Sequence, residues 1–179
     1  MSTLNHFVRY RDEPSFRALY RQHTPMIFAM AVRLSGSRNE AEELVQEAWV
    51  RAVERIESFG RRSKFGTWLA GILVNCHRES MRRDVRSQPA SAEVIEAFGH
   101  SEIPRADPAD LEKAIGSLAA GYREVVVLHD LYGYTHQEIS ELLGIEPGTS
   151  KSQLARGRAR LRRALTEKAP HARGNGSGN

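Results

Sequence analysis

Apolar residues recur at every third or fourth position along most of this chain, which is the spacing of an amphipathic helix. The clearest apolar face lies between Asn39 and Ser58 and consists of Ala41, Leu44, Val45, Ala48, Ala52, Val53 and Ile56. Another face follows a loop at Phe59–Ser63 and consists of Phe65, Trp68, Leu69, Ile72, Leu73 and Cys76. The pattern predicts an all-α protein.

Residues typical of helix ends divide the first half further. A short apolar face at Phe16–His23 is followed by Thr24-Pro25, which has the form of an N-cap with proline at the first helical position. We therefore expect a new helix to begin there and to end at Ser35-Gly36-Ser37. Ser37 and Glu40 have the spacing of a capping box, which predicts the start of the next helix.

The middle of the chain differs in composition from both sides. Residues 87–107 are rich in Ser and Pro and poor in large apolar side chains, so they predict a flexible linker with one short helical turn around Val94–Phe98. Asp107-Pro108 then begins a second module by the same cap-and-proline rule. We therefore expect two small helical domains, at 13–86 and 108–166, and a disordered tail at 167–179.

The second module ends in a predicted helix-turn-helix. Val125-Val126-Val127 favours a strand by propensity, but the helical spacing on either side favours a buried helix over 120–131. A helix at Thr135–Leu143, a turn at Gly144-Ile145-Glu146 and a long helix at Pro147–Leu165 follow. Gly144 suits the turn because glycine tolerates a left-handed backbone.

The last predicted helix has a polar and basic surface. Its N-terminal end carries Ser150, Lys151, Ser152 and Gln153, groups that suit base edges in the major groove. Thr149 is a candidate cap, and the capped helix end favours a phosphate. Five arginines lie further along, some placed to straddle phosphates and others to solvate the helix: Arg156, Arg158, Arg160, Arg162 and Arg163. A plain helical hairpin with a basic face has the same pattern, but turn, cap and charge together favour DNA binding.

Charge is concentrated in two zones. The 179 residues carry a net charge of +4, which by itself says little about partners. Residues 61–86 hold seven basic and two acidic groups, and residues 151–168 hold seven basic and one acidic group. The stretch between them is acidic. Two basic zones predict two contacts with a phosphate backbone, although two solvated helix faces would have the same charges.

Composition excludes several classes of site. A single cysteine, Cys76, leaves no internal disulfide framework and no zinc site of the CxxC type. The chain has no apolar run near the roughly 18 residues of a membrane span and no signal-peptide core at its start, so we expect a cytoplasmic protein without membrane insertion. We expect no metal, no cofactor and no small-molecule substrate.

The first basic zone mixes cations with aromatic rings. Phe59, Phe65 and Trp68 lie among Arg61, Arg62, Lys64, Arg78, Arg82 and Arg83. Bases of a single strand stack on such rings while cations follow the backbone. The alternative is that the rings are core anchors, which we favour for Phe65. Asn75 and Arg78 lie one helical turn apart and are placed to face a base together.

The Asn39–Ser58 helix has an acidic exposed side made of Glu40, Glu42, Glu43, Gln46, Glu47 and Glu54. Such a face repels DNA and suits protein docking. A solvated helix held by pairs such as Glu47–Arg51 is the simpler interpretation.

These motifs together resemble a known family. Ala41-Glu42-Glu43-Leu44-Val45-Gln46-Glu47-Ala48-Trp49, Phe65-Gly66-Thr67-Trp68-Leu69 and the stretch from Asn75 to Arg83 are similar to region 2 of bacterial RNA polymerase sigma factors. The stretch from Tyr122-Arg123-Glu124-Val125 to Leu161 is similar to region 4. The resemblance is to the extracytoplasmic-function (ECF) group of the sigma-70 family and covers roughly residues 13–86 and 108–166.

The resemblance implies partners for each surface. Region 2 would dock on the β′ clamp of core RNA polymerase through Glu43, Leu44, Gln46, Glu47 and Trp49. It would also melt and capture the −10 promoter element, with Arg61, Arg62, Lys64, Trp68, Asn75, Arg78 and Arg82 as candidates. Region 4 would bind the β flap and the −35 element, with Thr149, Ser150, Lys151, Ser152, Gln153, Arg156 and Arg158 as candidates. Many relatives are held inactive by an anti-sigma factor, so the resemblance suggests that partner too.

The sequence leaves two other classes to weigh. A freestanding helix-turn-helix regulator would have a similar second half, but it has no need of Trp68, Asn75 and Arg78 in this arrangement. An enzyme would have to use His129-Asp130 or His136 with Glu138, which lack a nucleophile, a phosphate loop or metal-ligand spacing. A promoter-specificity subunit without catalytic residues is therefore the leading hypothesis.

Overall fold

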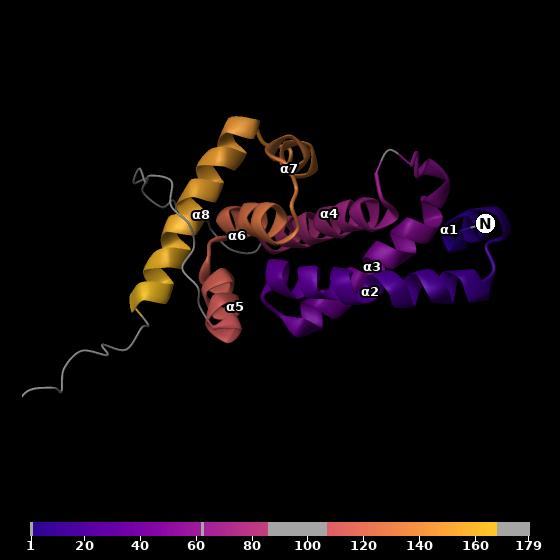
Figure 1. Ribbon diagram of the computed structural model, residues 1–179, viewed down its shortest axis with the longest axis horizontal. Coiled ribbons are helices and arrows are strands. Elements are labelled where there is room, and N and C mark those ends of the chain that lie inside the picture. Colours follow the sequence, from indigo (N-terminus) through magenta and orange to yellow (C-terminus); the bar gives the residue numbers. More distant parts are fainter. Residues whose placement is uncertain (1, 62, 86–106, 168–179) are drawn as a thin grey trace, which may run out of the picture.

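The computed structural model describes residues 2–61, 63–85 and 107–167, which are mostly helical (Figure 1). The N-terminal module contains α1 (Thr3–Tyr10), α2 (Glu13–Ser35), α3 (Arg38–Glu54), a short 3-10 turn η1 (Ile56–Ser58) and α4 (Phe65–Val85). The C-terminal module contains α5 (Pro108–Ser117), α6 (Ala120–Val126), a π-helical turn η2 (Val127–Leu131), α7 (His136–Leu143) and α8 (Pro147–Glu167). The prediction of an all-α fold is confirmed.

Several predictions of helix ends hold at the level of single hydrogen bonds. Ser37 Oγ accepts from the Glu40 backbone N–H at 3.4 Å, and Asp107 Oδ1 accepts from the Ala109 N–H at 2.8 Å. Gly144 ends α7 with a left-handed backbone at φ 61°. Polar caps and glycine therefore mark these boundaries because they satisfy backbone groups that the helix leaves unpaired.

The expected break at Thr24-Pro25 is wrong, because α2 runs unbroken through Pro25. Thr24 does not cap a helix; its Oγ1 accepts a hydrogen bond from Trp49 Nε1 at 3.1 Å. The apolar side chains on both sides of Pro25, such as Leu19 and Ile27, pack into one core. That continuous packing outweighs the one backbone hydrogen bond that proline removes.

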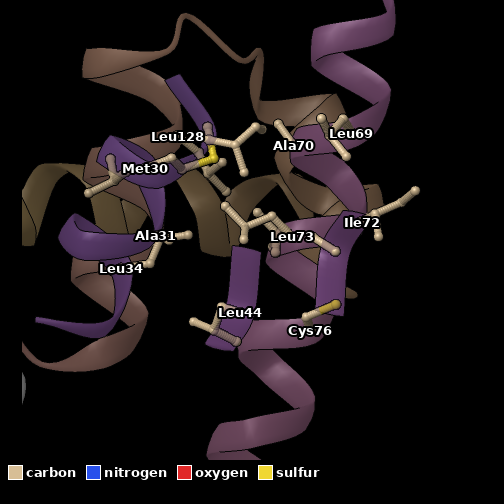
Figure 2. Close-up of a cluster of buried hydrophobic side chains, with 14 of the residues drawn as sticks. Met30, Ala31, Leu34, Leu44, Leu69, Ala70, Ile72, Leu73, Cys76 and Leu128 are labelled. Atoms are coloured by element: carbon tan, nitrogen blue, oxygen red, sulfur yellow. The ribbon is translucent and has the colours of Figure 1, made fainter. Parts of the chain in front are cut away.

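The two modules share a hydrophobic core. Figure 2 shows Leu128, from η2, close to Met30 of α2 and to the α4 side chains Ala70 and Leu73. All four are fully or almost fully buried. Helix α2 also contacts α5 and α6, and α4 contacts α7. The modules are thus packed side by side rather than held apart (Figure 1).

Polar contacts between the modules surround this core. Arg33 of α2 pairs with Glu112 of α5 at 2.7 Å, and Tyr134 donates its hydroxyl to the Thr67 carbonyl at 3.2 Å. Arg123 reaches furthest: its guanidinium donates to the carbonyl of Leu34 at 3.0 Å across the boundary. It also donates to the carbonyls of Gly116 and Leu118, each at 2.9 Å, within its own module.

His77 is buried at the same boundary. Within the described part of the chain neither of its ring nitrogens makes a hydrogen bond. Carboxylate oxygens of Glu40 and Glu124 lie 3.9 and 4.0 Å from the ring. Burial, helped by the positive charges of Arg123 and Arg78, lowers the pKa of His77 to about 4. The ring is therefore neutral near pH 7.

Two predictions cannot be compared with the fold. The linker at 87–107, with its helical turn at Val94–Phe98, and the tail at 167–179 lie outside the described residues, apart from Asp107 and Glu167. Among the helices that are described, none combines the length and apolar character needed to cross a bilayer.

Candidate nucleic-acid interface

Helices α7 and α8 form the predicted helix-turn-helix. Thr135 and Glu138 make a full capping box at the start of α7, and Gly144 turns the chain towards α8. Residues Ser150, Leu154, Gly157 and Leu161 form the buried face of α8. A Cβ atom at Gly157 would lie 2.6 Å from Val126 Cγ2, so glycine there lets α8 approach α6 closely.

The N-terminal end of α8 presents part of the predicted set to solvent. Thr149, Lys151 and Ser152 are exposed, and Gln153 and Arg156 are partly exposed. Thr149 is not the cap, because α8 begins at Pro147. Thr149, Lys151, Ser152 and Gln153 thus lie in the first turns of a helix rich in arginine, and Arg156 lies further along it.

Ser150 is a correction to the predicted duplex-reading set. It is 0% exposed, and its Oγ lies 2.9 Å from His136 Nδ1. It precedes Leu154 by four residues, which places both on the inner face of the helix. Ser150 therefore holds α8 to α7 in this structure and cannot meet a base edge.

Arg158 is also placed differently from the prediction. Its Nε donates to Asp130 Oδ2 at 2.9 Å, and its Nη2 donates to Asp130 Oδ1 at 2.6 Å. This two-pronged pair, typical of Arg with a carboxylate, turns the guanidinium towards η2. The structure assigns Arg158 to an internal ion pair instead of the DNA-facing set.

The basic set of the N-terminal module lies on α4 and the loop before it. Arg61, Lys64, Asn75 and Arg82 are exposed, whereas Arg62 lies outside the described residues. Arg61 has a left-handed backbone, at φ 55°.

Two members of this set are engaged within the protein. Trp68 is half-buried and packs against Phe59 and Phe65, with ring centroids 5.2 and 5.7 Å apart. Phe65 itself is a core residue, as favoured from the sequence. Arg78 donates to the carbonyl of Leu143 at the end of α7. Asn75 and Arg78 thus differ: the first side chain is open to solvent and the second contacts the other module.

The residues of α3 that are predicted to dock on core polymerase fall into an exposed group and a buried group. Glu43 and Gln46 are exposed, and Glu47 pairs with Arg51 in the i,i+4 arrangement. Leu44 and Trp49 are both only 4% exposed, so in this structure neither is open to direct contact with a partner. Both belong to the apolar side of the helix that builds the core.

Val50 is an exposed residue of α3 that the sequence does not predict to be part of a docking face. It is 58% exposed, unusually high for a valine on a well-packed helix. It lies four residues after Gln46 and seven after Glu43, which puts it on the acidic face. The sequence contains this feature as an apolar residue at the helical spacing of the polar residues Glu43 and Gln46.

The histidine and carboxylate pairs that suggested catalysis have other partners. His129 Nδ1 lies 2.9 Å from Asp130, which also binds Arg158, and Glu138 is part of the α7 capping box. Across the described residues no cluster of three metal-ligating side chains is found. These residues build the helix-turn-helix.

Comparisons with known proteins agree with this geometry. Residues 19–87 match the family model "Sigma-70 region 2", and residues 109–161 match "Sigma-70, region 4". The chain is 32% identical over 176 residues to the ECF RNA polymerase sigma factor SigW of Bacillus subtilis, covering 89% of this chain and 94% of that protein. It is 33% identical over 168 residues to SigE of Mycolicibacterium smegmatis, and the match covers 86% of this chain but only 63% of that longer protein.

Two solved structures have a similar fold. The sigma factor RpoE of Bartonella quintana, crystallised with the anti-sigma factor NepR, has a TM-score of 0.67 and 29% identity, with 87% of this chain and 99% of that chain covered. CnrH, solved with the cytosolic domain of CnrY, has a TM-score of 0.61 at 21% identity, covering 93% of this chain and 97% of that one, which supports the fold alone.

Proposed function

This chain belongs to the extracytoplasmic-function group of the sigma-70 family of RNA polymerase sigma factors, and on that premise we propose that its two modules divide promoter recognition between them. The chain binds core RNA polymerase and directs it to promoters, as an initiation factor rather than a catalyst. The N-terminal module engages core polymerase and the −10 element. The C-terminal module engages the −35 element and the β flap.

The observation that carries this proposal is the exposure of suitable side chains on both modules. Thr149, Lys151 and Ser152 are open at the N-terminal end of α8, where a helix in the major groove makes its base contacts. Lys64, Asn75 and Arg82 are open on the other module, along the same loop and helix as the partly exposed ring of Trp68. A duplex reader and a strand-capturing surface on one chain are the two parts that promoter opening needs.

Core polymerase would dock on the exposed side of α3. Glu43, Gln46 and Glu47 lie there with Val50, so the face combines negative charge with one open apolar side chain. Charge guides the approach of a basic partner, and a central apolar contact adds affinity. Leu44 and Trp49 lie on the opposite, buried side of α3 and pack into the core.

We assign region 2 to residues 13–86, a linker to 87–107, region 4 to 108–166 and a tail to 167–179. The linker is long enough for two separated promoter boxes, since about 20 residues reach up to roughly 70 Å when extended. The chain would act in the cytoplasm, where bacterial polymerase meets DNA. An anti-sigma factor is a further proposed partner, because RpoE of Bartonella quintana was crystallised with one.

Run-off transcription with purified core polymerase tests the function. The template pool carries randomised sequence upstream of a fixed cassette, and transcripts are sequenced to find the start sites. We expect discrete start sites only when the chain is added to core polymerase. Tight binding of the chain alone to a palindromic duplex, without initiation, would instead identify a freestanding regulator.

Trp68→Ala separates strand capture from duplex binding in the same assay. If the ring stacks on a base, transcription from a fully paired template falls several-fold more than from a template with a pre-melted −10 segment. Because Trp68 also packs against Phe59, the unfolding midpoint of the variant is measured in parallel. Equal losses on both templates would assign Trp68 to the core alone.

A further inference from the structure

A continuous series of side-chain contacts joins η2, α7 and α8 beside the end of α8 that we propose reads the promoter. It runs from Arg158 to Asp130, then to His129, His136 and Ser150. His129, Asp130 and His136 are the residues of this series that the sequence offers as candidate catalytic groups. Their contacts point to a different role.

The first half of the series is an ion pair with a supporting histidine. Asp130 accepts hydrogen bonds from Nε and Nη2 of Arg158 at 2.9 and 2.6 Å, and it lies 2.9 Å from His129 Nδ1. The side chain of Asp130 is only 12% exposed. Burial acts to raise the pKa of Asp130, but the bonds from Arg158 and His129 outweigh it and lower the pKa. The carboxylate is therefore charged when it binds Arg158.

The second half leads to the start of α8. The ring of His129 stacks on His136, with centroids 4.7 Å apart and planes 27° apart. His136 Nδ1 lies 2.9 Å from the hydroxyl of Ser150, which is fully buried. The next residue, Lys151, is exposed. The series thus holds α8 at two points, Ser150 in its first turns and Arg158 two turns later.

The π-helical turn η2 reaches two neighbours from one short segment. A π turn contains an extra residue relative to a regular α-helix, which changes the directions of the side chains within it. In η2, Leu128 enters the shared core, while His129 and Asp130 face α7 and α8. Such turns occur frequently at functional sites.

We propose that Asp130 and His136 are positioning residues for −35 recognition, which set the orientation of α8 through Arg158 and Ser150 without touching DNA. This rests on the proposed function, in which α8 reads duplex DNA. Contacts to base edges are directional, so a small rotation of α8 would weaken them more than contacts to phosphates. Asp130 and Arg158 therefore act as one unit in sequence discrimination.

The experiment compares Asp130→Ala, Arg158→Ala and the double variant in the full chain bound to core polymerase. The probe is a duplex recovered from a randomised library with the wild-type holoenzyme, and the reference is a scrambled duplex of equal length. Binding is measured against KCl concentration. We expect each single variant to lose about tenfold in the ratio of selected to scrambled affinity, the size of one good base contact. The double variant should lose no more than either single one, and the salt slope should be unchanged.

Two results would overturn the proposal. If Arg158 touches a phosphate, Arg158→Ala lowers the salt slope by about one, whereas Asp130→Ala frees the guanidinium and strengthens binding. If the pair serves stability alone, both duplexes lose affinity equally and the ratio is unchanged. Should Asp130→Ala fold poorly, Asp130→Asn keeps the shape and one acceptor while removing the charge, and it should reduce the same ratio.

Ser150→Ala tests the other end of the series. It removes only the hydroxyl that meets His136, and alanine suits the interior of a helix. We expect a several-fold loss in the same ratio; an unchanged ratio would exclude His136 from the positioning role. A wild-type holoenzyme that selects no sequence at all would instead contradict the proposed function, so the two failures are distinguishable.

Discussion

Arg123 offers a measure of what its hydrogen bonds, within its own module and across the module boundary, contribute to stability. Its guanidinium donates to the carbonyls of Leu34, Gly116 and Leu118, so one side chain closes the ends of two helices and crosses the boundary. Arg123→Met keeps most of the apolar stem and removes every donor. The substitution therefore tests the hydrogen bonds separately from packing.

The expected loss follows from the environment of each carbonyl. The bond to Gly116 is exposed, so water replaces it, whereas the bonds to Leu34 and Leu118 are partly buried. Two bonds to a charged donor at roughly 1.5 kcal/mol each give a loss of about 3 kcal/mol in the free energy of unfolding. Partial burial of the Arg123 charge, which lowers its pKa, works against this value.

Urea unfolding followed by circular dichroism measures this loss. Arg17→Met is the matched control, because Arg17 forms an exposed pair with Glu13 on α2, with side chains 60% and 74% exposed. Such pairs contribute at most about 1 kcal/mol. If Arg123→Met unfolds at the same urea concentration as Arg17→Met, the bonds to Leu34 and Leu118 contribute nothing and the reasoning is refuted.

Three further predictions concern DNA, core polymerase and pH. The double variant Lys151→Ala, Arg156→Ala should weaken promoter binding, measured by fluorescence anisotropy at several KCl concentrations. The slope of log affinity against log salt concentration should fall by roughly one for each phosphate that is no longer bound, and an unchanged slope would exclude phosphate binding by these two residues. Glu43→Lys, on the exposed face of α3, should reduce affinity for core polymerase several-fold without shifting the unfolding midpoint, and unchanged affinity would remove Glu43 from the docking face. The pKa of His77 is lowered to about 4 in the folded chain, so protonation of this ring favours the unfolded chain. The free energy of unfolding is therefore unaffected by His77 above pH 6.5 and falls as the pH drops towards 4, by about 2 kcal/mol at pH 5. Because burial raises the pKa of Glu124, which acts in the opposite direction, the test compares wild type with His77→Gln; parallel pH profiles would contradict the assignment.

Local signals in the sequence predicted much of the fold. Apolar spacing identified α3 and α4, and the caps at Asp107 and Ser37 marked helix starts because their side chains bond to backbone N–H groups nearby. Gly144 marked the turn by its backbone freedom. These features depend on neighbours within four residues, which a sequence pattern contains.

Features that depend on distant contacts were not predictable in the same way. Pro25 continues α2 because residues from other helices pack on both sides of it. The polar residue Ser150 faces inward because His136, on another helix, supplies its partner. The internal partner of Arg158 was not predictable for a similar reason, since it is an acidic residue 28 positions earlier in the chain. Composition identified a basic helix but not which of its cations had internal partners.

The core around Leu128 has a practical consequence for any attempt to study the halves in isolation. Cutting the chain between α4 and α5 would leave Leu128 on one fragment and Met30, Ala70 and Leu73 on the other, so that each fragment would lose part of its apolar cover. Newly exposed apolar patches of that kind promote self-association. Truncated fragments would therefore expose apolar surfaces that are covered in this structure, and quantitative binding work is better done with point substitutions.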